Sequence, residues 1–404
     1  MKKTFVAAAV LGALAGSAFA ADVTLYGVVD LGLNYQNTKV DSDNAARDKD
    51  STNVFKEQAG QNSGSRFGLK GTEDLGNGYK VGFVLENGFT PDDGKLGNGG
   101  RLFGREANLY VTSDFGTLSF GRVGALMSGC GSYDQMKYTP FATGWAGTAT
   151  KANFMLADRD RMDNTVTYVT PEFAGFKVLA QYSFNRDGQE TAGNERQNDR
   201  YAALGAAYKN GAFSSALVVD TVMHNNKSAN DKDSLGVTLG ASYDFEVVKL
   251  FAMGQYGQHE NFLGTTFDKG EKLDVGTYDS AYFKTLSSKG WKGYGVNLGA
   301  TAPVLGGTVL AQASYLDAKT HDAMTYEQAK ADDAFDHVTP GKYKEAKAQN
   351  WGIALGYTYP FSKRTNVYTY VSYNETQVKT EAEAKDTDVT TKFTEFGLGI
   401  KHTF

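Results

Sequence analysis

The last twelve residues, 393–404, read FTEFGLGIKHTF and alternate between two kinds of side chain. One row contains Phe396, Leu398, Ile400, His402 and Phe404, and the other contains Gly397, Gly399, Lys401 and Thr403. Successive side chains of a β-strand point to opposite faces, so this segment predicts a strand with one apolar face. In a soluble sheet the outward face would be charged, whereas here the aromatic face is nearly free of charge.

The same alternation recurs along the chain, beginning with VTLYGVVDLGLNY at residues 23–35. Because lipid cannot satisfy backbone hydrogen bonds, strands that face lipid must close into a barrel. The pattern predicts an all-β fold, a sixteen-stranded antiparallel transmembrane β-barrel. We expect the strands near residues 22–35, 64–74, 78–89, 102–113, 116–123, 163–170, 174–185, 200–209, 212–223, 235–245, 247–258, 292–302, 307–317, 349–359, 365–376 and 391–404.

The connections between these strands are alternately short and long. The short ones carry turn residues, such as Gly-Asn-Gly at 76–78 and Asn-Gly at 210–211. The charged stretch 39–56 and the segment 317–349 are expected to be long polar loops. All six prolines fall in predicted turns or loops, as a barrel without free edges requires.

The N-terminal segment MKKTFVAAAVLGALAGSAFA, residues 1–20, has two lysines, an apolar run and Ala-Phe-Ala at its end. This pattern predicts a secretory signal peptide, because the apolar run is too short for a membrane anchor. Residues 21–404 are then expected to form one outer-membrane barrel with no second domain.

Composition narrows the possible functions. The formal net charge of −5 argues against nucleic-acid binding. A single cysteine, Cys130, excludes an internal disulfide and a cysteine-based metal cluster, and no cofactor or metal motif is present. We interpret Cys130 as a small loop residue, with a functional thiol as the alternative.

One long connection, 123–163, is unusually apolar. It carries Met127, Tyr133, Met136, Tyr138, Pro140, Phe141, Trp145, Phe154, Met155 and Leu156. Such residues are uncommon in a solvated surface loop. We expect this loop to fold inward, pack on the inner wall and narrow the lumen; alternatively it lies over the barrel rim or against a neighbouring subunit.

Several motifs together resemble a known family. They are VTLYGVVDLGL, SRFGLKGTEDLGNGYKVGFVLENGF, FGREANLYVTSDFGTLSFGR, NTVTYVTPEFAGF and the terminal GIKHTF. They are similar to the general porins of Gram-negative bacteria, particularly those of beta-proteobacteria. The resemblance implies a trimeric barrel with its third loop folded into the lumen, and a terminal phenylalanine similar to the assembly signal of such barrels.

A sixteen-stranded barrel is too wide to be filled by side chains, so it leaves an aqueous channel. We therefore expect passive diffusion of small hydrophilic solutes and ions, selected by size and by the charges at the narrowest point. The expected partners are further copies of the chain in a homotrimer, outer-membrane lipid and lipopolysaccharide, and the diffusing solutes.

Strand parity predicts which charges face the lumen. Phe67 and Leu69 take the lipid side, which points Arg66 and Lys70 inward, and the same argument points Lys80 and Glu86 inward. The family resemblance adds Arg105 to the basic wall, together with Arg159 or Arg161. Arg105 shares parity with the outward residues that follow it, so it faces inward only beside a bulge or at the upper end of its strand; Arg122 has the same difficulty.

Acidic residues of the long loop are expected to face this basic wall. The candidates are Asp134, Asp158, Asp160 and Asp163. For each charge, ordinary solvation in a loop or in the lumen is the alternative interpretation. The sign of ion selectivity stays open, because inward acids such as Asp30 and Glu86 offset the basic wall.

Other classes of function have weaker support. The histidines lie in loops, at strand ends or, for His402, on the lipid side, so no Ser-His pair falls on one wall, and no hydrolase or nucleotide-binding motif is present. An adhesin that uses its outer loops and a substrate-specific channel remain alternatives. For the latter, Tyr26, Tyr201, Tyr368 and Tyr370 have inward parity but form no evident ladder.

Overall fold

The structure is a computed structural model and describes residues 23–42, 50–141, 145, 154–157, 159–188, 198–224, 232–260, 290–321, 324–325, 342–382 and 387–404. The elements are β1 (Thr24–Ser42), β2 (Asp50–Ala59), β3 (Arg66–Gly76), β4 (Tyr79–Thr90), β5 (Lys95–Leu96), the 3-10 turn η1 (Asn98–Gly100), β6 (Glu106–Ser113), β7 (Gly116–Gly124), β8 (Arg161–Val169), β9 (Phe176–Ser183), β10 (Arg200–Asn210), β11 (Phe213–Met223), β12 (Leu235–Asp244), β13 (Lys249–Glu260), β14 (Trp291–Val304), β15 (Gly307–Thr320), β16 (Met324–Thr325), β17 (Lys342–Pro360), β18 (Thr365–Ala382) and β19 (Thr387–Thr403).

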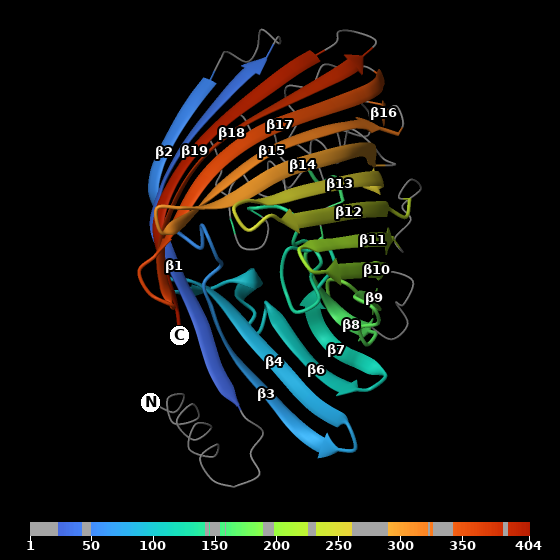
Figure 1. Cartoon of the computed structure of the whole chain (residues 1–404). Coiled ribbons are helices and arrows are strands. Elements are labelled where there is room, and N and C mark those ends of the chain that lie inside the picture. The colour runs from blue at the N-terminus through green and yellow to red at the C-terminus, as the bar shows by residue number, and fades with distance from the viewer. Residues whose placement is uncertain are drawn as a thin grey trace, which may run out of the picture.

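The strands form one closed antiparallel barrel of sixteen strands, as the alternation predicts (Figure 1). Neighbouring strands of the wall pair in chain order, with β4 next to β6 and β15 next to β17. The barrel closes where β19 pairs with β1, from Val28 opposite Thr403 to Ser42 opposite Val389. Strands β2 and β3 share one position in the wall, because both pair with β1 at different heights. In the described part of the chain, no helix is long and apolar enough to cross a membrane.

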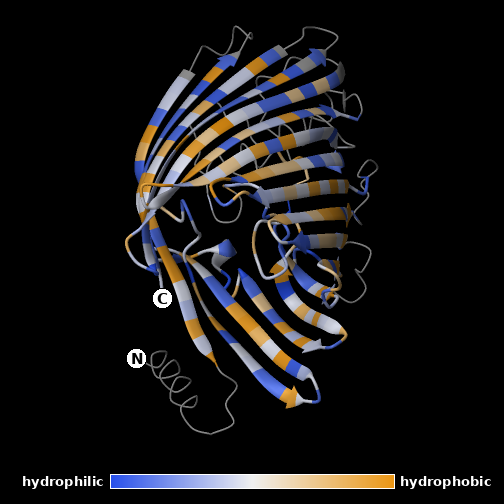
Figure 2. Cartoon of the chain, in the orientation of Figure 1, coloured by the Kyte–Doolittle hydropathy of each residue, from blue (hydrophilic) through white to orange (hydrophobic). Residues whose placement is uncertain are grey.

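The two faces of the wall differ in polarity, and the last strand shows it clearly. Phe396, Leu398 and Ile400 are 48%, 47% and 50% exposed, whereas Glu395, on the opposite face, is fully buried. Figure 2 shows the same alternation of apolar and polar residues along neighbouring strands. An apolar outer face and a polar inner face are the arrangement that a membrane barrel requires. On β13, for which the alternation is ambiguous, Leu250 faces outward and Met253 is buried inside.

Some predicted boundaries were wrong. The stretch 39–56, expected to be a loop, extends β1 to Ser42 and forms most of β2, because its polar residues continue the strand pairing beyond the apolar band. Likewise, β17 has 19 residues and β18 has 18, whereas β9 has eight, so the wall is tallest around β17 to β2 (Figure 1). Pro303 and Pro360 lie at strand ends instead of outside the strands, where a missing N–H interrupts little of the pairing.

Candidate functional site

The connection between β7 and β8 packs against the inner face of the wall. Figure 1 shows the described part of this connection inside the barrel. Its described apolar side chains are buried together with inward residues of the barrel. Leu126, Met136 and Phe154 are fully buried and share a cluster with Tyr201 of β10, Val218 of β11 and Met253 of β13. These contacts explain the apolar composition of a segment that a solvated loop would not carry.

Glycines on the inner wall provide the space in which this connection lies. In the first part of the connection, which follows β7, Tyr138 contacts Gly240 of β12, Pro140 contacts Gly299 of β14, and Phe141 contacts Gly356 of β17. In the last part, which leads to β8, Phe154 contacts Gly295, Leu156 contacts Gly257, and Ala157 contacts Gly236. A Cβ atom at any of these wall positions would lie 3.0 Å or less from the connection. The wall therefore fits the connection closely, because it carries glycine at the six positions that the connection covers.

Asp134, a predicted constriction acid, stabilises the first turn of the connection. Its Oδ1 accepts hydrogen bonds from the backbone N–H groups of Gly129 at 2.9 Å and Met136 at 3.1 Å. The residue is 2% exposed. A buried carboxylate that holds two backbone donors acts mainly on the shape of the turn.

Arg159, a predicted pore-lining residue, is buried where the connection returns to β8. Its Nη2 donates to Asp220 Oδ1 at 2.6 Å and to Glu260 Oε1 at 2.8 Å, and its Nη1 donates to Glu260 Oε2 at 2.8 Å. The three side chains are between 2% and 4% exposed. Burial alone lowers the pKa of the guanidinium, but the two carboxylates outweigh it and raise that pKa well above its usual value. Arg159 thus holds the connection to β11 and β13.

Arg66, Arg105 and Arg161 form a basic cluster, in which Arg66 and Arg105 pair with Glu86 and Arg161 lies near Arg105. Glu86 Oε1 lies 2.6 Å from Arg105 Nε, and its Oε2 lies 3.5 Å from Arg66 Nε. The side chains of Arg66 and Arg105 are 25% and 16% exposed. Arg105 precedes β6, at the strand end where parity no longer fixes its direction. Burial and the nearby charge of Arg161 lower the pKa of Arg105.

The two predicted lysines lie apart from the basic cluster. Lys70 places its Nζ 5.3 Å from the centre of the Tyr26 ring. Lys80 lies 3.8 Å from Asp74, near the turn that joins β3 to β4, and its side chain is 55% exposed. By the strand register, Lys80 sits opposite Thr112 and Glu86 opposite Glu106, so Lys80 lies six positions along β4 from Glu86 of the cluster.

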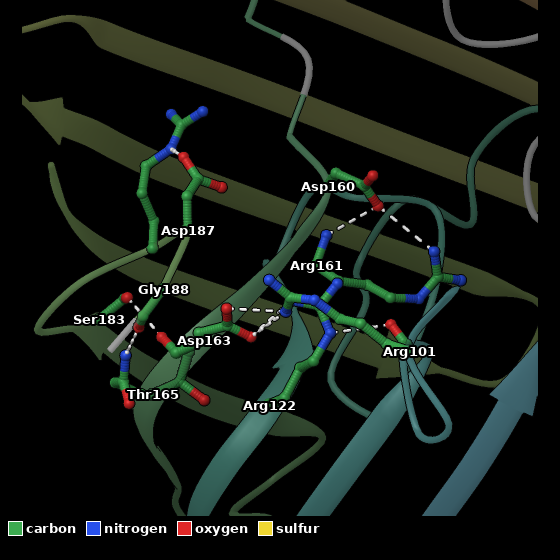
Figure 3. Close-up of polar contacts among 12 residues, drawn as sticks. Arg101, Arg122, Asp160, Arg161, Asp163, Thr165, Ser183, Asp187 and Gly188 are labelled. Atoms are coloured by element: carbon green, nitrogen blue, oxygen red, sulfur yellow. Dashed lines mark hydrogen bonds and ion pairs between the residues drawn. The ribbon is translucent and has the colours of Figure 1, made fainter. Parts of the chain in front are cut away.

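The remaining loop acids occupy different surroundings (Figure 3). Asp160 is 79% exposed on its side chain and accepts hydrogen bonds from the backbone and the guanidinium of Arg161. Asp163 accepts from Arg101 at 2.8 Å and from Arg122 at 2.6 Å. Arg122 sits opposite Ala107, so it keeps outward parity. Asp158 lies outside the described residues.

Three acids of the site were missed in the sequence: Glu106, Asp220 and Glu260. Glu106 and Asp220 have inward parity within predicted strands, next to outward Ala107 and Val219, so the alternation alone could have found them. Glu260 follows the predicted end of its strand, and no sequence signal placed it on the wall.

Comparisons with known proteins agree with this architecture. A family model described as Gram-negative porin matches residues 7–379. An outer membrane porin protein of Bordetella pertussis is 34% identical over 427 residues, which cover 100% of both chains. Outer membrane porin protein 32 of Delftia acidovorans is 32% identical over 384 residues, 92% of this chain and 89% of its own. The solved anion-selective porin from Comamonas acidovorans superposes with a TM-score of 0.63 at 26% identity and covers 95% of this chain and 100% of its own.

Proposed function

This chain belongs to the Gram-negative porin family, and we propose that its channel is narrowest between the basic cluster and the connection that follows β7. As an outer-membrane porin, it forms a water-filled channel for passive diffusion of small hydrophilic solutes and ions. The observation that carries the proposal is the burial of the β7–β8 connection against the inner wall of a barrel this wide. A segment placed there narrows the lumen without filling it.

The charges around the narrow part favour anions. The site holds five guanidinium groups and four carboxylates, which leaves a positive excess. They are those of Arg66, Arg101, Arg105, Arg122 and Arg161, and of Glu86, Glu106, Asp160 and Asp163. Low-dielectric walls concentrate the field of such a cluster in the water between them. The similar Comamonas acidovorans protein, an anion-selective porin by its title, supports the same sign.

Further parts of this proposal rest on the family resemblance and on the sequence. Residues 1–20 act as a signal peptide and are removed before Ala21. The barrel assembles as a homotrimer and contacts lipopolysaccharide with its outer face. It has no catalytic role, in line with curated relatives that are porins.

The reversal potential under a potassium chloride gradient in a planar bilayer tests the charge assignment. We expect Arg66→Gln combined with Arg105→Gln to shift selectivity from anions towards cations, because Glu86 then dominates the local field. A unit charge at about 4 Å changes an ion's energy in water by roughly 1 kcal/mol, or about fivefold in the permeability ratio.

Lys80→Gln is the matched control for this test. It also removes a positive charge from the inner face of β4, but at the far end of the strand. We expect its reversal potential to match that of the unmodified protein. Equal shifts in the control and in the double variant would show that the basic cluster is not the selective part of the channel.

A further inference from the structure

Trp145 of the β7–β8 connection contacts two tyrosines of β18, and with Phe141 they form a cluster of four aromatic rings. Its ring centre lies 5.1 Å from that of Phe141, 5.5 Å from Tyr368 and 5.6 Å from Tyr370, all in edge-to-face contacts. Tyr368 and Tyr370 are 1% and 2% exposed. Edge-to-face packing fixes the relative orientation of rings, so Trp145 is held in one position.

The hydroxyl groups of the two tyrosines are bound to the strands that close the barrel. Tyr368 donates to Asp30 Oδ1 of β1 at 2.5 Å, and Tyr370 donates to Glu395 Oε1 of β19 at 2.9 Å. Asn34 of β1 donates to the Tyr370 oxygen at 3.2 Å. Both carboxylates are fully buried. Buried hydroxyl groups need such partners, so these hydrogen bonds hold both rings at their outer ends.

Two glycines of β19 leave the space in which the side chains of Tyr368 and Tyr370 extend across that strand. A Cβ atom at Gly397 of β19 would overlap the ring of Tyr370, and one at Gly399 would overlap the hydroxyl of Tyr368. The tyrosine side chains therefore lie flat across β19, and Tyr368 reaches β1 on the far side. Glycine in a strand often marks a close approach of this kind.

We propose that Tyr368 and Tyr370 are positioning residues that hold Trp145, and with it the β7–β8 connection, at the width needed for selective diffusion. The inference rests on the proposed function and deepens it. Since the tyrosine hydroxyls bind Asp30 and Asn34 of β1 and Glu395 of β19, their hydrogen bonds are complete only when β1 and β19 have paired. Closure of the barrel thus fixes the narrow part of the channel.

Single-channel recording with neutral polyethylene glycols of increasing size tests this role. Trp145→Ala should admit larger polymers and increase the fluctuation of the open-channel current, because the connection loses its contact with β18. Tyr368→Phe combined with Tyr370→Phe keeps the rings and removes only the hydroxyls, so the current fluctuation should increase with an unchanged reversal potential. Trp145→Phe keeps a ring and should restore most of the polymer exclusion.

Two matched controls lie on the outer face of the same wall. Trp351→Ala removes an equal ring from β17, where it is 42% exposed. Tyr373→Phe removes a hydroxyl that donates to Glu375 at 2.8 Å on β18. Neither should change polymer exclusion or current fluctuation. Heat-modifiable migration on gels identifies folded barrels for all variants.

The outcomes separate the two proposals. If Trp145→Ala and the double tyrosine variant conduct and exclude polymers like the unmodified protein, the positioning role is overturned and the pore stands. If the folded, unmodified protein does not conduct, both the pore and the role that rests on it are overturned.

Discussion

Arg159→Met is expected to lower the free energy of unfolding by about 3 to 5 kcal/mol, since it leaves two buried carboxylates without their cation. Asp220 and Glu260 are 2% and 3% exposed on their side chains, so water cannot replace the guanidinium. The connection should also separate from β11 and β13, which increases the fluctuation of the open-channel current. Unfolding by urea in lipid vesicles, followed by tryptophan fluorescence, measures the loss.

Arg186→Met provides the comparison for this loss. Arg186 also pairs with a carboxylate, at 2.7 Å from Asp187, but the two side chains are 31% and 67% exposed. Exposed pairs contribute about 0 to 1 kcal/mol. Adding Asp220→Asn and Glu260→Gln to Arg159→Met should recover part of the stability, because no unpaired charge then stays buried. A cost for Arg159→Met no greater than that for Arg186→Met would contradict the assignment of a buried ionic anchor.

Gly295→Ala is expected to displace the returning part of the connection from the wall. A Cβ atom at this position of β14 would overlap the carbonyl oxygen of Phe154. Overpacking of this kind costs about 1 to 3 kcal/mol, and here one backbone must move away from another. We expect lower stability against urea together with a changed single-channel conductance.

Gly254→Ala is the control for this change. Gly254 lies on the neighbouring strand β13, and a Cβ atom there would meet only the Gly295 carbonyl oxygen, at 3.9 Å. It adds the same methyl group without a clash, so stability and conductance should stay close to those of the unmodified protein. If the two variants behave alike, the connection does not lie on Gly295.

The barrel itself could be predicted from the sequence because its cause is local. In a membrane barrel each strand repeats the same alternation, so residues such as Leu398 and Ile400 reveal their face without knowledge of their partners. The inward parity of Arg66 followed from the same rule. The apolar composition of 123–163 indicated a segment whose side chains are buried. In the structure, its described side chains are buried against the inner wall.

The structure of the site depends on distant pairs, which alternation does not encode. Arg159 meets Asp220 and Glu260, 61 and 101 residues further along the chain, and this pairing turns an expected pore charge into a buried anchor. Tyr368 and Tyr370 had the predicted inward parity, but their bonds to Asp30 and Glu395 depend on which strands are adjacent when the barrel closes. Asp134 differs again, because a carboxylate within a turn and one facing water look the same in a sequence.

The position of the β7–β8 connection is the central claim, and a disulfide between it and the inner wall tests it most directly. A Cβ atom at Gly240 would lie 2.8 Å from the Cβ of Tyr138, so a shift of the connection by about 1 Å brings the two positions to the spacing of about 3.8 Å in disulfides. Cys130→Ser removes the one native thiol. In that background, Tyr138→Cys with Gly240→Cys should form an intramolecular disulfide on mild oxidation, seen as loss of maleimide labelling that a reductant restores.

Tyr138→Cys with Leu239→Cys, where Leu239 is 58% exposed on the outer face, should keep both thiols. Free thiols at 138 and 240 in a folded, oxidised barrel would contradict the account.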